Sequence, residues 1–407
     1  MNKLPNGWAE YKLKDIMSIS SKRYNPNKDT KNYKCIELEH IESETGILNG
    51  HTNSKDIHSV KNVFEKGEVL YGKLRPYLKK FYLAKFDGVC SSEIWVLKGK
   101  KVINDFLYYF IQQDNFNYIA NVSIGMIMPR ADWSYMSEIS FNIPPLDEQK
   151  RIASALSKID AYLENTIKLI EEKERFKRGI AKKLLTCKEG ENIPEARFKG
   201  FNDDWRKEKL SSMIKIQGGY AFKSSEFKKS GIPIIRISNI SNTDNNMNMK
   251  EVVYYNEIEN EKSFIIKKSD LLIALSGAPG KSSIYNLEEK AYLNQRVGLF
   301  KIIDTKKINN SFLSQYVFSS IFQNKLKPFI TRGVQPNISP KDIENLDILL
   351  PSLKEQEKIG GYLSLLDKEI DNLKKQKELI KEMKRGAMQK LLSGEVRLSK
   401  NAFNENI

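Results

Sequence analysis

The chain has 407 residues, of which 40% are hydrophobic and 29% are charged. This length exceeds what one hydrophobic core usually supports, so a single small domain is excluded and two domains with a connecting region are expected. Lysine and arginine total 67 against 51 aspartate and glutamate, which gives a net charge of +16. That balance favours a polyanionic partner, with nucleic acid as the first candidate, over a small acidic substrate.

The cysteines and the amino-terminal stretch bear on the compartment. Cys35, Cys90 and Cys187 are widely separated, which argues against a disulfide framework and against a cysteine zinc site. The first residues lack the apolar core of a signal peptide, and no apolar run approaches the roughly 18 residues that span a bilayer. We therefore expect a cytoplasmic protein with no membrane association.

Two globular blocks are predicted from short apolar runs separated by Gly, Pro and Asn turns. The first block contains a β-type run at residues 93–97 and a helical pattern near residues 105–119. The second contains a β-type run at residues 232–237 and a helical pattern near residues 311–327. Both blocks are therefore expected to be mixed α and β structures.

Two segments of the chain repeat one another at an offset of 207 residues. Residues 144–186 and 351–393 align without a gap and share 17 identities in 43 positions. This match indicates an internal duplication. The globular blocks match only faintly, as expected if they meet different ligands while the repeated segments meet each other or identical partners. Surface drift alone is the alternative.

Each repeated segment predicts a long helix that starts just after proline and contains no proline inside. Apolar residues recur at alternating spacings of three and four, a heptad seam typical of coiled coils. The seam residues are Leu156, Ile159, Leu163, Ile170, Ile180 and Leu184 in the first segment and Leu363, Leu366, Ile370, Leu373, Ile380 and Leu391 in the second. Lys177, Lys377 and Lys384 interrupt the seam, which costs stability but fixes the register. A solvated helix face with accidental spacing is the alternative.

The order of the segments predicts how the two helices pair. The first helix leads into another globular block rather than a short turn, so the second helix should return antiparallel to it. The predicted organisation is a first block at 1–143, a first helix at 144–186, a linker at 187–204, a second block at 205–350, a second helix at 351–393 and a polar tail at 394–407.

This order resembles the specificity subunits of type I restriction–modification systems. Each block is closed by P-x-L-x-E-Q, and each long helix ends in K-R-G-x-x-x-x-L-L. Supporting stretches are GKLRPYL at 72–78, GMIMPR at 125–130, NQR at 294–296 and GVQPNI at 333–338. The resemblance covers essentially the whole chain. It implies an α+β fold in which two mixed α/β target-recognition domains are separated by two long antiparallel coiled-coil helices, with a pseudo-two-fold internal repeat.

The resemblance also implies a function and a set of partners. Each domain would read one half of a bipartite double-stranded DNA site, while the helices space the domains and dock two methyltransferase subunits. Restriction and translocase subunits would complete a complex that acts as an adenine methyltransferase and ATP-dependent endonuclease. The chain itself would be a non-catalytic specificity subunit without a cofactor.

Motifs for independent catalysis are incomplete. Gly280-Lys281-Ser282 resembles the end of a phosphate-binding loop, but the loop requires glycine where Leu275 stands. The stretch 142–146 imitates the tetrad of adenine methyltransferases, although an isoleucine intervenes and no aromatic residue follows. A metal-nuclease triad of Asp270, Glu288 and Lys290 would be an accidental spacing in so charged a chain, and His40, His51 and His58 lack paired ligand spacing. We expect no catalytic site and no metal site.

Loops that combine basic, amide and aromatic side chains are the candidate DNA contacts, because arginine suits guanine, Asn and Gln suit adenine, and lysine suits phosphate. In the first block they are Lys73, Arg75, Tyr77, Lys79, Lys80 and Arg130. In the second block they are Lys281, Asn294, Gln295, Arg296, Arg332, Gln335 and Asn337. These residues could instead have structural roles. The alternatives are a solvated strand face around Tyr77, packing of Arg130 on Asp132, and hydrogen bonds from Asn294 and Gln295 to buried backbone groups.

Two other classes of function compete with the specificity subunit. One is a coiled-coil adaptor whose basic heads bind RNA or another polyanion, which would bind without sequence preference and lose affinity steeply with salt. The other is a nuclease or methylase that acts alone.

Overall fold

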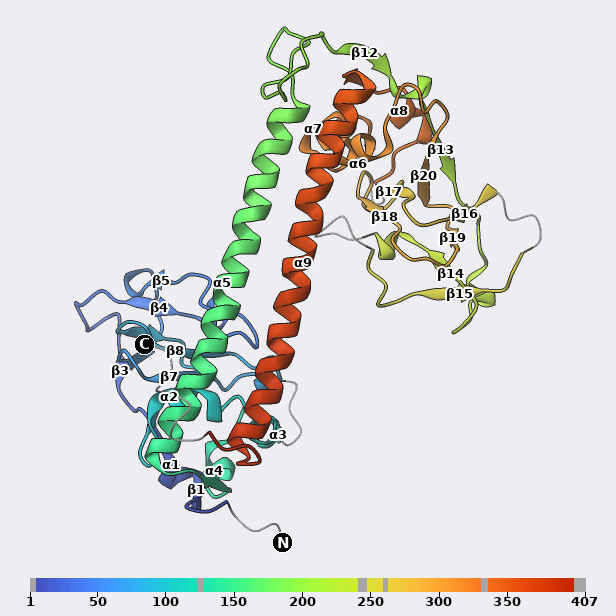
Figure 1. The fold of residues 1–407 in the computed structure, drawn as a ribbon. Coiled ribbons are helices and arrows are strands. Elements are labelled where there is room, and N and C mark those ends of the chain that lie inside the picture. The colour runs from blue at the N-terminus through green and yellow to red at the C-terminus, as the bar shows by residue number, and fades with distance from the viewer. Residues whose placement is uncertain (1–4, 123–127, 241–246, 259–262, 331–335, 399–407) are drawn as a thin grey trace. The chain divides into compact units, whose positions relative to one another are not determined.

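The computed structural model describes residues 5–122, 128–240, 247–258, 263–330 and 336–398. The chain forms two compact units. Unit 1 comprises residues 1–169 and 374–407, and unit 2 comprises residues 170–373. Each unit contains a globular part and portions of two 40-residue helices, α5 (Leu146–Leu185) and α9 (Leu353–Leu392) (Figure 1).

In the described residues, the globular part of unit 1 contains two sheets and a two-stranded ribbon. The four-stranded sheet has the order β2 (Met17–Ile19), β10 (Ile94–Gly99), β7 (Val69–Gly72) and β8 (Phe81–Leu83). The five-stranded sheet has the order β3 (Arg23–Tyr24), β6 (Lys61–Phe64), β9 (Gly88–Cys90), β4 (Lys34–Ile36) and β5 (Thr52–Asn53). The ribbon pairs β1 (Ala9–Lys12) with β11 (Ser140–Ile143), and a short helix α1 (Leu13–Ile16) follows β1.

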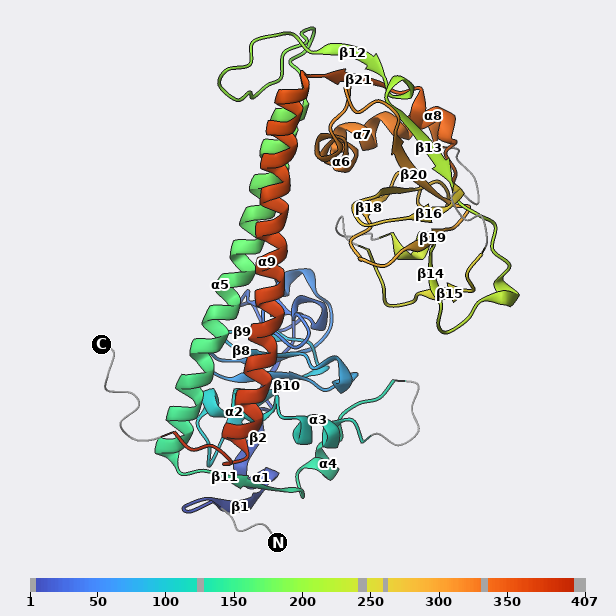
Figure 2. The same cartoon turned by 45° about the vertical axis from the view of Figure 1, so that its right-hand side comes forward.

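Unit 2 repeats this plan. One four-stranded sheet has the order β13 (Ile214–Gly218), β20 (Val297–Ile302), β17 (Leu271–Ala274) and β18 (Ser282–Ile284). Figure 2 labels β13, β20 and β18 of this sheet. The other has the order β15 (Val253–Tyr255), β14 (Ile232–Ile235), β19 (Ala291–Leu293) and β16 (Ile265–Ile266). The ribbon pairs β12 (Arg206–Lys209) with β21 (Asp347–Leu350), and a short helix α8 (Pro340–Glu344) precedes β21.

Among the strands that the structure describes, each unit has a parallel pair at the equivalent place, which identifies the duplication in the globular parts. In unit 1, β4 lies parallel to β9 with Ile36 opposite Cys90. In unit 2, β14 lies parallel to β19 with Ile235 opposite Leu293. The other pairs within these sheets are antiparallel. The mixed α/β character and the internal repeat predicted from the sequence are confirmed, and the repeat extends through the diverged blocks.

The helical pattern late in each block is broken into two helices, where the sequence predicted one. Unit 1 has α2 (Asn104–Phe110) and α3 (Asp114–Ala120), and unit 2 has α6 (Asn310–Phe318) and α7 (Ser320–Leu326). Gln113 and Ser319 adopt extended backbone angles at the breaks, with ψ of 144° and 153°. The Ser319 hydroxyl accepts the Phe322 N–H and caps α7, which explains a new helix start that apolar periodicity does not reveal.

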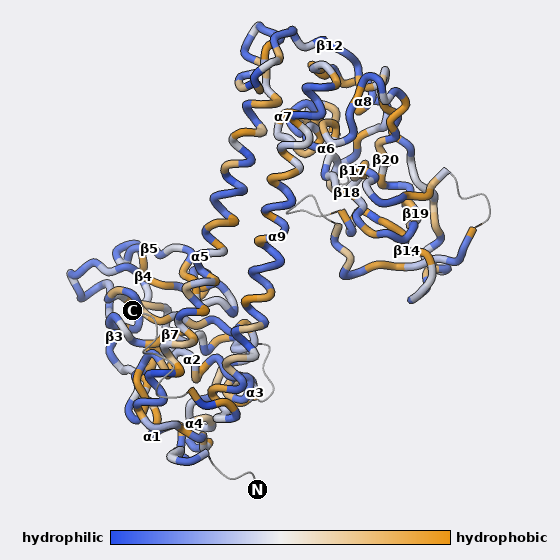
Figure 3. Tube along the Cα trace, in the orientation of Figure 1, coloured by the Kyte–Doolittle hydropathy of each residue, from blue (hydrophilic) through white to orange (hydrophobic). Residues whose placement is uncertain are grey.

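The long helices carry the predicted apolar seam (Figure 3). Leu156 of α5 is buried in the core of unit 1 together with Leu391 of α9. Leu184 of α5 is buried in the core of unit 2 together with Leu363 of α9. Within each unit, the amino-terminal part of one helix therefore packs against the carboxy-terminal part of the other. This pairing is antiparallel, as predicted.

Ion pairs set the same register. In unit 2, Lys173 lies 2.7 Å from Glu369, and Lys177, half-buried in the seam, pairs with Asp367.

Further short helices and turns in unit 1 include α4 (Trp133–Met136) and a 3-10 turn at Pro76–Leu78.

The Glu-Gln dipeptide near the start of each long helix makes contacts that hold the fold together. Gln149 donates to the Pro144 and Lys101 carbonyls at 2.9 and 3.1 Å and accepts the Ile103 N–H at 3.0 Å. Gln356 makes the equivalent three bonds, to Pro351, Lys307 and Asn309. Both glutamines are almost fully buried. Each helix start is thus fastened to its own globular part, because these bonds satisfy backbone groups that would otherwise be buried without partners.

The glutamate of each dipeptide binds an arginine from the segment that follows the other long helix. In unit 1, Arg397 lies 2.6 Å from buried Glu148, which also accepts the Trp8 indole N–H at 3.2 Å. In unit 2, Arg197 lies 2.8 Å from buried Glu355. These charge-assisted bonds stabilise both ends of the duplicated arrangement.

Candidate nucleic-acid interface

A strained loop follows strand β7 in unit 1. Arg75 and Lys79 flank the 3-10 turn with positive φ angles of 52° and 47°. Such backbone is costly for residues with a Cβ and tends to occur at functional sites. The loop is held by the Arg75 N–H, which donates to Pro129 O at 2.8 Å, and by the Lys80 ammonium, which donates to Leu38 O at 2.6 Å.

The candidate residues of this loop have different environments. Arg75 and Tyr77 are exposed, and neither side chain has a hydrogen-bond or ion-pair partner within the residues that the structure describes. Lys73 is partly exposed. Lys79 lies 3.6 Å from Asp114 and 3.8 Å from Glu44. Lys80 supports the loop itself through its bond to a main-chain carbonyl.

Arg130 lies beside this loop and forms a bidentate pair with Glu93. Its Nε and Nη2 donate to the two carboxylate oxygens at 3.0 and 3.3 Å. The carboxylate raises the pKa of the Arg130 guanidinium. Asp132, the alternative partner suggested by the sequence, instead accepts the Ser134 N–H at 2.8 Å and caps α4. Gly125, Met126 and Ile127 of the same stretch lie outside the described residues.

Three segments far apart in the sequence meet in unit 2. The Leu275 N–H donates to Arg296 O, and the Ile338 N–H donates to Leu275 O, each at 2.9 Å. The Gly277 N–H donates to Pro336 O at 3.0 Å. We call these three backbone hydrogen bonds the ladder of unit 2. The ladder brings together the segments that carry three candidates, Lys281, Arg296 and Asn337. Arg332 and Gln335 lie outside the described residues.

The three residues of the turn at 294–296 differ in exposure and in role. Asn294 is partly buried and its side-chain oxygen accepts the Arg296 N–H at 3.3 Å, so this side chain does satisfy the backbone. Gln295 and Arg296 are exposed, and among the described residues their side chains have no hydrogen-bond or ion-pair partner. Lys281 is partly exposed, and its carbonyl accepts the Ala274 N–H that closes the loop.

Unit 1 contains the same backbone ladder. The Lys73 N–H donates to Glu93 O, the Ala131 N–H donates to Lys73 O and the Arg75 N–H donates to Pro129 O, at 2.8 to 2.9 Å. Equivalent positions in units 1 and 2 are Lys73 and Leu275, Arg75 and Gly277, Glu93 and Arg296, and Arg130 and Asn337. The scaffold is therefore shared, while the side chains that it presents differ in charge and size.

The equivalence reveals site residues that the sequence analysis missed. Ser91, Ser92 and Glu93 form the turn of unit 1 that corresponds to 294–296. Tyr220, also missed, lies beside the turn of unit 2: its carbonyl accepts the Gln295 N–H at 3.0 Å and its side chain is 48% exposed. The signal that could have found the turn is its position directly after a buried strand in both copies, because Cys90 and Leu293 end parallel-paired strands.

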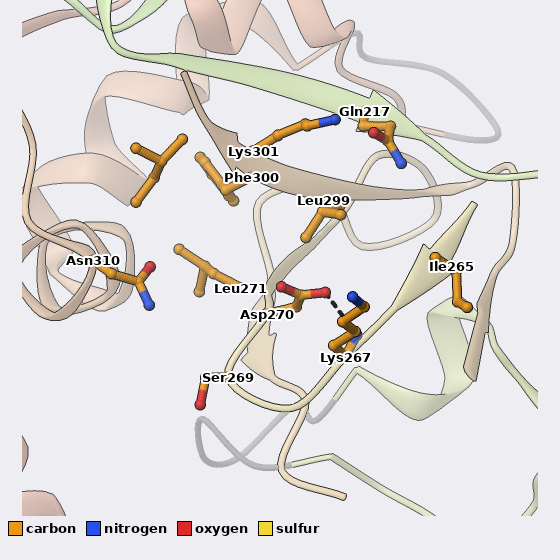
Figure 4. A pocket seen from close by; sticks show the side chains of 11 residues that line it. Gln217, Ile265, Lys267, Ser269, Asp270, Leu271, Leu299, Phe300, Lys301 and Asn310 are labelled. Atoms are coloured by element: carbon orange, nitrogen blue, oxygen red, sulfur yellow. Dashed lines mark hydrogen bonds between the residues drawn. The ribbon is translucent and has the colours of Figure 1, made fainter. Parts of the chain in front are cut away.

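The residues of the imitated catalytic motifs have other roles. Asp270 accepts the Lys267 N–H at 2.7 Å beside a cavity of 420 Å³ (Figure 4). Glu288 pairs with Lys268, and Lys290 lies 2.7 Å from Glu257. The His40 ring accepts the Glu37 N–H at 2.9 Å and caps a turn. Within the described ranges, acidic, cysteine and histidine side chains form no group of three that could hold a metal. None of the described helices combines the length and apolarity needed to cross a membrane.

The fold and the paired ladders define a protein with two copies of one recognition scaffold, each attached to a shared helical pair. Residues 5–172 and 202–382 both match the family described as the type I restriction modification DNA specificity domain. The chain belongs to this family of type I restriction–modification specificity subunits. The resemblance drawn from the sequence is confirmed.

Individual relatives agree with this assignment. The chain is 29% identical to the MjaVIII specificity subunit of Methanocaldococcus jannaschii over 86% of this chain and 81% of that protein. It is 30% identical to the EcoDI specificity subunit of Escherichia coli over 41% of this chain and 38% of that protein. The crystal structure of the type I S subunit from M. genitalium has the same fold, with a TM-score of 0.58, 17% identity and coverage of 96% and 97%.

Proposed function

We propose that each unit reads one half of a bipartite double-stranded DNA target. The observation that carries the proposal is the repeated ladder, because one backbone scaffold presents Arg75, Glu93 and Arg130 in unit 1 but Gly277, Arg296 and Asn337 in unit 2. The two units share a backbone arrangement but expose different side chains. Such an arrangement suits recognition of a different base sequence by each unit on the same duplex. The net charge of +16 supplies the sequence-independent attraction to phosphates.

We assign the two half-sites to residues 1–143 and 205–350, which carry these ladders. The candidates that remain exposed in the described residues are Arg75, Tyr77, Arg130, Gln295, Arg296 and Asn337. Lys80 and Asn294 act mainly as supports, because both are bonded to the main chain. Family membership favours the specificity subunit over the polyanion adaptor, and specificity subunits are not themselves catalysts.

Two methyltransferase subunits and restriction–translocase subunits are the proposed protein partners. In support, the helices expose large apolar side chains that a monomer would not need. Unit 1 exposes Tyr162, Leu169, Leu379 and Met383, and unit 2 exposes Phe176 and Leu365. Exposed apolar side chains on a helix face are typical of protein contacts.

Methylome sequencing of cells that express this chain with its methyltransferase tests the proposal. We expect one split motif, and exchange of residues 8–143 for the block of a related subunit should alter one half of that motif only. A change in both halves would contradict the assignment of one half-site to each domain. The pure chain with DNA, magnesium and S-adenosylmethionine should show neither cleavage nor methylation.

A further inference from the structure

Each ladder presents an arginine beside the turn that follows the parallel-paired strand, but from different segments; unit 1 presents Arg75 as well, where unit 2 has Gly277. In unit 1 the arginine is Arg130, on the segment that follows residue 128, and the turn supplies Glu93. In unit 2 the turn supplies Arg296, and the segment equivalent to that of Arg130 supplies Asn337. Both segments bond to the same central residue, Lys73 or Leu275. Both copies of the scaffold therefore present a guanidinium from one of these two adjacent segments, while the segment that supplies it differs.

The pairing with Glu93 defines what Arg130 can still bind. Glu93 occupies the Nε and Nη2 side of the guanidinium at 3.0 and 3.3 Å. The Nη1 and Nη2 edge remains for a second planar acceptor, and O6 with N7 of guanine is the acceptor pair that matches this fork. A phosphate fits less well, because the adjacent carboxylate repels it.

The surroundings of both arginines suit contact with a large ligand. The Arg130 side chain is 45% exposed even though it is paired. Arg296 is exposed, and no acidic partner neutralises it within the described part of the chain. Its main chain is fixed on both sides, since its carbonyl accepts the Leu275 N–H and its N–H donates to Asn294. An exposed side chain on a turn whose main chain is held by hydrogen bonds can reach a base edge without rearrangement of the backbone.

We propose that each unit reads one guanine of its half-site with a single arginine of the ladder, Arg130 in unit 1 and Arg296 in unit 2. Glu93 is a positioning residue that holds Arg130 in its reading orientation. This inference rests on the proposed function, and it adds the base and the side chain responsible at one position of each half-site.

Arg130→Lys and Arg296→Lys test the inference, because lysine keeps the charge but loses the planar fork. The experiment is methylome sequencing of cells that contain the methyltransferase and either the natural chain or one variant. Arg130→Lys should relax one G·C position in the half-site of unit 1, with discrimination at that position lower by roughly ten- to hundredfold. Arg296→Lys should do the same in the other half-site.

Glu93→Gln should relax the same position as Arg130→Lys, to a smaller extent, and should add nothing to it in the double variant. A purely structural role of Glu93 would instead lower methylation evenly over all sites. Arg206→Lys is the matched control, since Arg206 is an exposed arginine of the β12–β21 ribbon. The methylated motif found with this variant should be the same as with the natural chain.

The outcomes separate the two levels of the proposal. An unchanged motif in both Arg→Lys variants would show that these arginines contact phosphates or nothing, and would overturn the inference. Relaxation in the wrong half-site, or at several positions at once, would overturn it as well. A natural chain that directs no split motif would contradict the proposed function itself.

Discussion

Lys384 of α9 lies buried in unit 1 with its ammonium 2.7 Å from the carboxylate of Asp160 on α5. The ammonium also donates to the Gln112 side chain at 2.9 Å, and the Tyr109 hydroxyl donates to Asp160 at 2.9 Å. The antiparallel seam of unit 1 therefore contains a polar network that also reaches Tyr109 of α2 and Gln112, two residues beyond the end of α2. Such a network suits only one register of the two helices.

We expect Lys384→Met to lower the free energy of unfolding by about 3 kcal/mol, because the variant removes the cationic partner of Asp160 in a largely buried place. The double variant Lys384→Met with Asp160→Leu should recover most of the loss. Chemical denaturation measures both. Lys381→Met is the control on the same helix, because Lys381 pairs with exposed Glu378 and should cost under about 0.5 kcal/mol. Equal stability of the Lys384 and Lys381 variants would contradict the role of the network.

Ser269 occupies a turn in which the equivalent residue of unit 1 is a glycine. Ser269 has a φ of 73° and Gly67 has a φ of 86°, and their N–H groups bond to equivalent carbonyls, Tyr285 and Ala84. We expect Ser269→Gly to stabilise unit 2 by about 1 kcal/mol and Gly67→Ala to destabilise unit 1 by a similar amount. Space is open around Gly67, so its change isolates the backbone effect. Shifts of the same sign in thermal unfolding would show that the φ argument is wrong.

Gly219 lets one chain segment approach the turn at 294–296. A Cβ on Gly219 would lie 2.1 Å from Leu293 O and 2.4 Å from its carbonyl carbon. Gly219→Ala must therefore move the turn that presents Arg296, and we expect methylation directed by the variant complex to fall at least tenfold. Gly218→Ala is the matched control, because nothing lies within 4 Å of its Cβ. In vitro methylation of a DNA fragment that carries the split site measures the difference, and equal activity of the two variants would refute the close approach.

Asp270 gives a pH dependence with a defined sign. Burial raises the pKa of its carboxyl above the ordinary value of 3.8. The folded chain therefore binds this proton more tightly than the unfolded chain, so its effect on stability is unfavourable at neutral pH and disappears as the pH falls through the folded pKa towards 3.8.

The comparison variant is Asp270→Asn, which retains an oxygen for the Lys267 N–H. At pH 7 we expect it to be at least as stable as the natural chain, and at pH 4 the natural chain should have gained stability relative to the variant. The measurement is the unfolding midpoint of both proteins at each pH. A relative gain of the natural chain towards alkaline pH would reverse the assigned sign.

Particular residues show how far sequence reasoning reached at the candidate site. The stretches around Arg75, Arg130 and Arg296 lie in loops, as predicted, because turn residues and charges are local signals, and their contact with DNA stays a prediction. Glu93 was assigned to a strand and was missed as a partner of Arg130, because the two residues lie 37 positions apart and meet only in the folded structure. Lys80 was selected for its charge, yet its bond to Leu38 depends on a segment 42 residues away.

The sequence by itself determined the two long helices, their seam and the duplication, because heptad spacing and a gapless repeat are properties of neighbouring residues that hold in any surroundings. Only the tertiary structure decided which loops form one ladder, where the breaks divide α2 from α3 and α6 from α7, and that the Glu-Gln motif joins each helix start to its globular part. Those features depend on backbone hydrogen bonds between distant strands, and backbone groups carry no mark of their partner in the sequence.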